Sequence, residues 1–264
     1  MKKNVLVTGS EGYIGSNFIH LLKWKNIDYV GVDRITNQAV ENIGNLYGIT
    51  HVVHLAALSS IKNCRENYNQ AVIDNISATF HIFHKSYRRR LPLVFASSGS
   101  AQSPEDNFYA TTKRIGELEA IRLNKKGANI KILRFANVYG GINYLDKKKS
   151  VVAKFYKDDP LVVNGNGSQT RDMIHVSDIC ESIWLALNEP TIINEPMGVG
   201  TGINTSILDL AKMFNKKITF NPDSDLVGPD ESPSDISLSF KYLGFKSSID
   251  LDIYVSKILT TLLS

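Results

Sequence analysis

The chain has 264 residues, of which 43% are hydrophobic and 21% are charged, and its formal net charge is +4. This length and composition predict a sizeable core, in one large domain or in one domain with a smaller lobe, and they exclude a wholly disordered chain. The basic runs at 88–90 and 147–149 are not interleaved with aromatic residues. They suit solvated helix ends or loops better than a nucleic-acid-binding surface.

Cys64 and Cys180 lie far apart in the sequence. They indicate neither a disulfide framework nor a zinc site, and we expect no bound metal. The apolar run near the N-terminus is too short for a signal peptide, and no segment reaches the ~20 apolar residues of a membrane span. We therefore expect a cytoplasmic protein without membrane contact.

Strand-like and helix-like patterns alternate along the first half of the chain. The strands are expected at 4–8, 28–33, 51–57, 91–98 and 130–137, and the helices at 12–25, 71–87 and 109–124. This alternation, with continuous apolar strands, predicts an α/β fold: a Rossmann-type, doubly wound parallel sheet with helices on both faces.

The second half is less regular. A short strand and turn are expected within 161–172, a loop at 221–234, and helices at 176–188, 205–214 and 249–263. We assign residues 1–138, completed by about 173–194, to a dinucleotide-binding domain. Residues 139–172 and 195–264 are expected to form a small C-terminal substrate-binding lobe.

The stretch "TGSEGYIG" at 8–15 lies between the first strand and the first helix. In a nucleotide-binding turn, Gly9 would permit the tight turn, Gly12 would let a pyrophosphate approach the backbone, and Gly15 would let the helix pack on the strand. Asp33 ends the second strand, where an acid accepts hydrogen bonds from ribose hydroxyls and repels a 2′-phosphate. This favours NAD over NADP, although Arg34 could soften the preference. The alternative is a glycine-rich loop beside a surface acid.

The stretch "YATTK" places Tyr109 and Lys113 on one face of a helix. An ammonium beside a tyrosine stabilises the phenolate and lowers its pKa, so the pair could take a proton from an alcohol as hydride leaves the same carbon. The preceding strand ends in "VFASS", which offers Ser98 to hold the substrate oxygen.

These motifs, in this order, resemble the extended branch of the short-chain dehydrogenase/reductase superfamily, the NAD-dependent nucleotide-sugar epimerase/dehydratase family. Further similar stretches are "HLAA" at 54–57, "NISAT" at 75–79, "LRFANVYG" at 133–140 and "PLVVNGNGSQTRDMIHVSDI" at 160–179. The resemblance runs from about residue 5 to about residue 179 and resumes faintly at 242–245.

The resemblance implies roles for particular residues. Ser98, Tyr109 and Lys113 would be catalytic, with Ser97 and Ser100 as neighbours that could be confused with Ser98. Ser98 would also bind substrate, as would Asn137 and Arg171, which match positions that contact the substrate's diphosphate. The expected cofactor contacts are Gly9, Gly12, Tyr13, Ile14, Gly15, Asp33, Arg34, Leu55, Ala56, Ala57, Tyr109 and Lys113.

Several polar residues have a structural interpretation that competes with a functional one. His54 and His175 suit hydrogen-bonded structural roles, and Asp172 and Asp178 suit turns or caps rather than metal ligation. Asn75 could lock a nearby strand or touch a ligand, Arg134 could be an ion-pair partner, and Tyr139 could belong to the core.

The sequence departs from the family pattern in four places. No strand is evident between residues 33 and 51, which leaves the adenine pocket undefined, and the loop from Ser98 to Tyr109 is short. Gly99 and Ser100 occupy the positions where the family's dehydratases carry an Asp-Glu pair, which argues against a 4,6-dehydratase. The late loop at 225–235 lacks the arginine that the family usually places there.

The leading hypothesis is an NAD-dependent epimerase that inverts C4 of a nucleotide-linked hexose through a keto sugar, in polysaccharide biosynthesis. The alternative is an NAD(P)H-dependent reductase of a nucleotide-linked 4-keto-6-deoxy sugar, and a third reading is a non-catalytic dinucleotide-binding sensor. The resemblance also suggests a homodimer through the helices near 71–87 and 109–124.

Overall fold

A parallel sheet forms the centre of the computed structural model, which describes residues 2–141, 150–222 and 230–260. Within these residues the sheet has six strands in the order β2-β1-β3-β4-β5-β9, and every pairing is parallel. The strands are β1 (Asn4–Thr8), β2 (Asp28–Val32), β3 (His51–His54), β4 (Leu93–Ser98), β5 (Ile130–Phe135) and β9 (Met197–Val199). The predicted Rossmann-type α/β sheet is confirmed.

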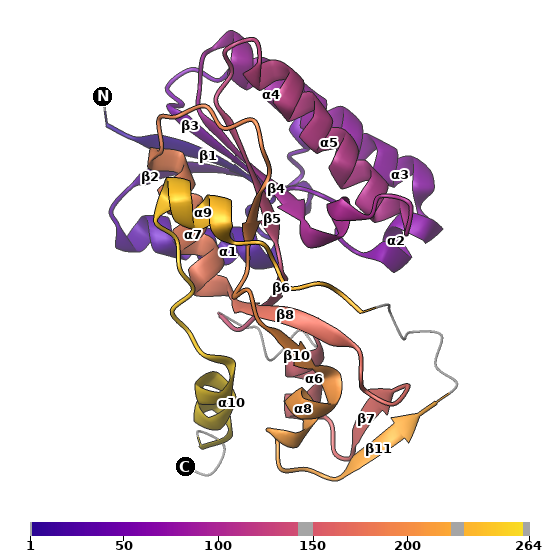
Figure 1. Cartoon of the computed structure of the whole chain (residues 1–264). Helices are drawn as coiled ribbons and strands as arrows, with labels where there is room; N and C mark the ends of the chain where they lie inside the picture. Colours follow the sequence, from indigo (N-terminus) through magenta and orange to yellow (C-terminus); the bar gives the residue numbers. More distant parts are fainter. Residues whose placement is uncertain (1, 142–149, 223–229, 261–264) are drawn as a thin grey trace.

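Helices cover both faces of this sheet (Figure 1). Successive side chains of β1 point to opposite faces: Val5 and Val7 pack in one core, and Leu6 packs in the other. The first core is completed by α1 (Tyr13–Trp24), α7 (Val176–Asn188) and α9 (Ser237–Leu243), and the second by α4 (Ala78–Arg88) and α5 (Phe108–Asn124).

The helix expected at 71–87 is interrupted. The chain forms α2 (Ile61–Glu66), α3 (Tyr68–Val72) and a π-helical segment (Ile73–Ser77) before α4 begins. Buried Asn75 lies in the π segment, accepts from Leu58 N at 2.8 Å, and donates to Leu58 O at 3.1 Å and to Thr112 Oγ1 at 3.1 Å. Asn75 therefore ties the segment after β3 to α5. Of the two roles considered for Asn75, these contacts support the structural one.

Residues 34–50, all of which the structure describes, contain two 3₁₀ turns (Arg34–Thr36 and Val40–Asn42) and no strand. The sheet therefore ends at β2, as the sequence indicated. Val40 and Leu46 are buried in the core beneath α4 and anchor this segment to the sheet.

A smaller unit lies below the large sheet in Figure 1. It has its own core, which includes Phe155, Leu210 and Phe214. Its strands are β6 (Asn137–Tyr139), β8 (Thr170–His175) and β10 (Asn204–Ser206) in one sheet, and β7 (Leu161–Asn164) and β11 (Ile218–Asn221) in another. Its helices are α6 (Val151–Lys157), α8 (Ile207–Lys212) and α10 (Leu251–Thr260).

The division between the two units differs from the one that the sequence predicted. β6 and the end of β8 pair in the smaller unit, although residues 1–138 and 173–194 were expected in the large domain. β9 pairs with β5 in the large sheet, and α9 packs against β9, so both belong to the large unit. The basic run at 147–149, part of the loop at 221–234 and the end of the expected helix at 249–263 lie outside the described residues. In the described part of the chain, no helix has the length and apolar character needed to cross a membrane.

The glycine turn yields a stability prediction. A Cβ at Gly15 would lie 2.0 Å from Gly9 O, whereas a Cβ at Gly44 would meet no heavy atom within 4 Å. We expect Gly15→Ala to reduce the free energy of unfolding by about 1–3 kcal/mol, because the first turn of α1 must shift. The control Gly44→Ala should change it by no more than about 0.5 kcal/mol. Urea unfolding of the two variants measures this, and equal stability would contradict the close packing.

Candidate active site

The glycine turn lies at the carboxyl end of β1, where ligands bind in parallel α/β sheets. Gly9 has a φ of +71°, and a Cβ there would lie 2.7 Å from Ala56 N. Gly12 is the N-cap residue of α1 and provides no capping side chain. No capping side chain therefore occupies the first N–H groups of α1, an arrangement that suits a phosphate.

Asp33 lies against this turn. Its carboxylate accepts from Glu11 N at 3.0 Å and from Ile35 N at 3.0 Å. The neighbouring Arg34 is held by two acids, at 2.5 Å from Glu41 and 2.7 Å from Asp74. Asp33, the acid expected to hold the ribose, thus lies at the glycine turn. Arg34, the cation that could favour a 2′-phosphate, is already paired with Glu41 and Asp74.

The residues around the turn fit a dinucleotide. The backbone of Leu55 and Ala56 borders Gly9, and their N–H groups donate to Thr8 O and Thr8 Oγ1. The hydroxyl of Tyr13 donates to Gly140 O at 2.6 Å, which links α1 to the end of β6. Cofactor contacts at Tyr13, Ile14, Leu55, Ala56 and Ala57 stay predictions.

The structure brings the three predicted catalytic side chains together. Ser98 is the last residue of β4, and Tyr109 lies near enough for the Ser98 side chain to oppose the rise in the Tyr109 pKa. Tyr109 lies in the first turn of α5, which Asn107 caps by accepting from Ala110 N at 2.9 Å. Lys113 Nζ donates to Ala96 O at 2.8 Å and lies 5.8 Å from the centre of the Tyr109 ring.

The neighbouring serines are now distinguished. Ser100 Oγ donates to Ser98 Oγ at 2.9 Å, so Ser100 supports Ser98. Ser97 is buried and donates to Glu117 Oε1 at 2.6 Å. Among the three, Ser98 is therefore the residue that contacts Tyr109.

Burial governs the ionisation of this cluster. It raises the pKa of Tyr109 to about 12, and the Ser98 side chain opposes the rise. It lowers the pKa of Lys113 to about 8, opposed by Cys64 and Glu117. The expected lowering of the Tyr109 pKa by Lys113 is absent in the chain by itself. Desolvation of the phenolate is the largest cause of the shift, and the Lys113 ammonium donates to Ala96 O instead.

Glu117 is a residue that the sequence analysis missed. It is 0% exposed, and its carboxylate accepts from Arg134 Nε and Nη2, each at 2.7 Å, as well as from Ser97 and from Arg114 at 2.9 Å. Arg134 is thus an ion-pair partner, one of the roles considered for it. The available signal was spacing, since Glu117 follows Lys113 by four residues and shares its helix face.

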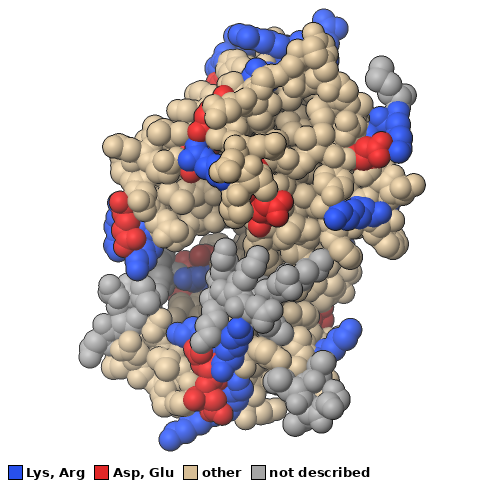
Figure 2. All heavy atoms as spheres, turned by 180° about the vertical axis from the view of Figure 1, so that it is seen from behind, with Lys and Arg blue, Asp and Glu red and all other residues tan. Residues whose placement is uncertain are grey.

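Asn137 and Arg171 both contact Glu231, which the sequence did not indicate. Asn137 Nδ2 donates to Glu231 Oε2 at 2.8 Å, and Arg171 Nε lies 3.1 Å from Glu231 Oε1. Seen from behind, the surface is hollowed between the two units, and acidic and basic side chains lie inside the hollow (Figure 2). The structure therefore brings the two predicted diphosphate contacts together, with a carboxylate between them.

The remaining polar residues have structural contacts. His54 bonds to Thr8 and Thr79, and Ser177 N donates to His175. Asp172 accepts from residues 201, 202 and 234, and Asp178 accepts from residues 248 and 249. Tyr139 is fully buried in the core of the smaller unit. Among the described residues, no three His, Cys, Asp or Glu side chains lie close enough to hold a metal ion.

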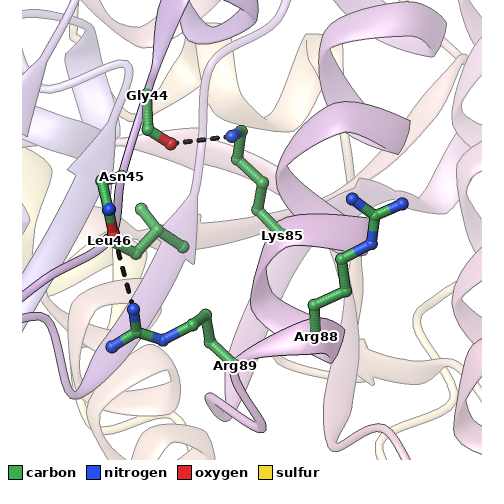
Figure 3. A pocket seen from close by; sticks show the side chains of 6 residues that line it. All are labelled: Gly44, Asn45, Leu46, Lys85, Arg88 and Arg89. Carbon is green, nitrogen blue, oxygen red and sulfur yellow. Dashed lines mark hydrogen bonds between the residues drawn. The ribbon is translucent and has the colours of Figure 1, made fainter.

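A separate pocket of about 270 Å³ lies at the end of α4 (Figure 3). Lys85 Nζ donates to Gly44 O at 2.7 Å, and Arg89 donates to Asn45 at 3.4 Å. α4 ends where the chain turns into β4, so this pocket lies at the amino ends of the strands, opposite the glycine turn. The basic run at 88–90 is an exposed helix end here, as expected, and the pocket is separate from the candidate active site.

A doubly wound sheet with a glycine turn, and a Ser-Tyr-Lys cluster at the carboxyl ends of its strands, defines a protein of the short-chain dehydrogenase/reductase type. The model of the NAD dependent epimerase/dehydratase family matches residues 5–200 of this sequence. The chain belongs to that family, within the extended branch of the superfamily.

The similar proteins include sugar-nucleotide enzymes. A protein of Methanocaldococcus jannaschii, provisionally described as a UDP-glucose 4-epimerase, is 29% identical, with 94% of each chain covered. The UDP-N-acetyl-alpha-D-glucosaminuronate decarboxylase of Bacillus cytotoxicus is 24% identical over 80% of this chain and 79% of its own. The structure of UDP-glucuronic acid 4-epimerase from Bacillus cereus, in complex with UDP-glucuronic acid and NAD, has a TM-score of 0.83 at 23% identity, covering 99% of this chain and 100% of that one.

Lys113 gives a pH prediction. Its pKa in the folded chain is about 8, against an ordinary value of 10.5, so the folded state binds its proton less readily than the unfolded state. The shifted pKa of Lys113 therefore lowers the free energy of unfolding. This destabilisation is complete below pH 8 and disappears as the pH rises to about 10.5. The stability of the wild type relative to Lys113→Met should therefore rise by about 3 kcal/mol across this interval.

Urea unfolding between these pH values, without cofactor, measures the effect. Lys125→Met, which removes an exposed lysine just beyond α5, is the matched control and should leave the wild-type pH dependence in place. A rise of the same size in Lys113→Met as in the wild type would contradict this assignment.

Proposed function

We propose that this protein is an NAD-dependent epimerase that inverts C4 of a nucleotide-linked hexose. The observation that carries the proposal is the contact between Ser98 and Tyr109, with Lys113 beside them, at the edge of the sheet that also presents the glycine turn. Membership of the epimerase/dehydratase family supports it, as do the epimerase names of similar proteins.

The chain's own side chains would bind the sugar and move one proton. Ser98 would hydrogen bond to the C4 oxygen, and Tyr109 would take the hydroxyl proton and later return it. When bound, NAD supplies the acceptor and donor of hydride at C4 and a positive charge near Tyr109. Such a charge is required, because burial alone raises the pKa of Tyr109 to about 12 and leaves the phenol protonated at neutral pH.

The two units would divide the binding task. The large sheet would hold NAD, with Asp33 on the adenosine ribose and Arg34 kept from a 2′-phosphate by Glu41 and Asp74. The smaller unit would hold the diphosphate of the nucleotide sugar through Arg171 on β8 and Asn137 on β6. An arginine suits a diphosphate because its planar fork matches two oxygens.

Elimination of water from the sugar is disfavoured by the residues around Ser98. Gly99 and Ser100 follow it, and neither provides an acid. Glu105 and Asp106 are exposed on the short loop before α5. These positions support epimerisation over 4,6-dehydration.

A panel of UDP-, dTDP-, GDP- and CDP-sugars, followed by proton NMR with trace NAD, tests the proposal. The panel includes the gluco, galacto, N-acetyl and glucuronic acid forms. A second anomeric signal that exceeds the amount of NAD would establish epimerase turnover. Loss of CO₂ from a uronic acid would instead show a decarboxylase, and turnover only of keto sugars with stoichiometric NADH or NADPH would show a reductase.

Tyr109→Phe tests the proposed proton transfer. We expect kcat to fall by about 10²–10⁴-fold, because the phenol hydroxyl is the group that carries the proton, while NAD binding stays within about twofold. Tyr68→Phe is the matched control: Tyr68 is exposed and stacks on Phe108 next to Tyr109, and this variant keeps the ring. Turnover rates and cofactor titration measure both effects, and a fully active Tyr109→Phe would refute the role of Tyr109.

We also propose a homodimer that pairs α4 and α5 with their counterparts. These helices lie side by side over one face of the sheet (Figure 1), and Leu118 on α5 is 52% exposed. Leu118 would lie in the interface between the paired helices, the arrangement that the family resemblance suggests.

Leu118→Glu should convert the dimer to a monomer, because it places a charge in the apolar contact. Ile253→Glu is the control, since Ile253 is 70% exposed on α10, far from α5 in Figure 1. Light scattering after size exclusion reads the mass of each variant. A monomeric wild type, or a Leu118→Glu variant that stays dimeric, would contradict the proposed interface.

A further inference from the structure

The carboxylate of Glu231 bridges two side chains, those of Asn137 and Arg171, rather than forming a simple surface ion pair. Each carboxylate oxygen binds a different partner: Oε1 lies 3.1 Å from Arg171 Nε, and Oε2 accepts from Asn137 Nδ2 at 2.8 Å. These partners come from β8 and β6, which are paired strands of the smaller unit. One anion therefore bridges the two donors that the proposed function assigns to a diphosphate.

The backbone holds Glu231 at this place independently of its side chain. Glu231 N donates to Thr170 O at 3.4 Å, and Glu231 O accepts from Asn204 Nδ2 at 2.5 Å and from Thr170 Oγ1 at 3.4 Å. Asp230 next to it accepts from Thr170 N at 3.0 Å. Rotation of the Glu231 side chain would thus break its contacts with Arg171 and Asn137, while Arg171 Nη1 keeps its bond to Thr170 O at 2.7 Å. The Glu231 side chain is 47% exposed, which leaves room to rotate.

The carboxylate of Glu231 and a diphosphate would compete for the positive charge of Arg171. A guanidinium binds carboxylate and phosphate with the same planar fork, so the two anions are alternatives at one arginine. Glu231 neutralises Arg171 in the absence of substrate, and a diphosphate brings more charge and more acceptor oxygens than one carboxylate. The diphosphate can therefore displace it, at a cost in affinity.

We infer that Glu231 is an internal anion that occupies the diphosphate subsite, and that the nucleotide sugar binds by replacing its carboxylate on Asn137 and Arg171. This rests on the proposed function, which places the diphosphate there. Glu231 sets the affinity for substrate and product and takes no part in the chemistry at C4. The same exchange in reverse stabilises the vacated subsite and favours release of the nucleotide sugar.

Calorimetric titration of the full chain, saturated with NAD, tests this inference with UDP and with inorganic pyrophosphate as probes. Glu231→Gln should bind both about tenfold more tightly than the wild type, because the competing charge is gone while the shape is kept. Uridine, which lacks phosphate, should bind the two proteins equally. Asp230→Asn is the matched control, since it removes the adjacent charge but not the bridge, and should change affinity by no more than about twofold.

Two results would overturn the inference and leave the proposed function intact: UDP binding to Glu231→Gln no more tightly than to the wild type, or an equal gain in Asp230→Asn. Weaker binding to Glu231→Gln would also overturn it and would make Glu231 a residue that positions Arg171 for substrate. If neither probe binds any variant, the assignment of the diphosphate to Arg171 fails together with the inference. Thermal unfolding of each variant confirms that the fold is retained.

Discussion

The buried carboxylate of Glu117 is the interaction on which the arrangement of the active site depends. It joins α5 to two neighbouring strands, through Ser97 at the end of β4 and Arg134 on β5. A buried charge is costly to desolvate unless it is paired and hydrogen bonded, and Glu117 has both compensations. Since Tyr109 and Lys113 precede it on the same helix, this anchor fixes the height and rotation at which they face the strand ends.

The cluster of Ser98, Tyr109 and Lys113 and the glycine turn share one edge of the sheet because every strand of the large sheet is parallel. The carboxyl ends of β1 and β4 therefore open on the same side, where α1 and α5 present their N-terminal turns. Close approach at Gly9 and Gly15 brings α1 down onto this edge. The pocket at the end of α4 lies at the other edge, and its cations mainly fasten the short segment that replaces a strand after β2.

Charge is handled differently at the two ends of the proposed substrate. Near Tyr109 the chain provides burial and a lysine whose pKa is lowered to about 8, so a phenolate there depends on charge that arrives with the ligands. In the smaller unit Arg171 is kept neutralised by an acid of the chain itself. In each case the groups that would contact ligands are held in place by their own neighbours before a ligand is bound.

The sequence by itself determined the elements and the order of the motifs. Apolar runs of strand length predicted β1 to β5, and helical spacing predicted α1, α5 and α7, because these patterns reflect burial of one local face. The Ser98, Tyr109 and Lys113 set followed from a strand end and a spacing of four residues on one helix. The missing strand after Asp33 was also evident, since residues 34–50 show no apolar run of strand length.

Only the tertiary structure decided how distant residues meet. The network of Ser97, Glu117 and Arg134 and the bridge of Asn137, Arg171 and Glu231 each join side chains from three segments, and no local pattern encodes such pairings. The place of β9 in the large sheet depends on pairing with β5, and the π-helical interruption on the bonds of Asn75. The pKa of Tyr109 rises because burial is a property of the folded surroundings, which a charge four residues away does not reveal.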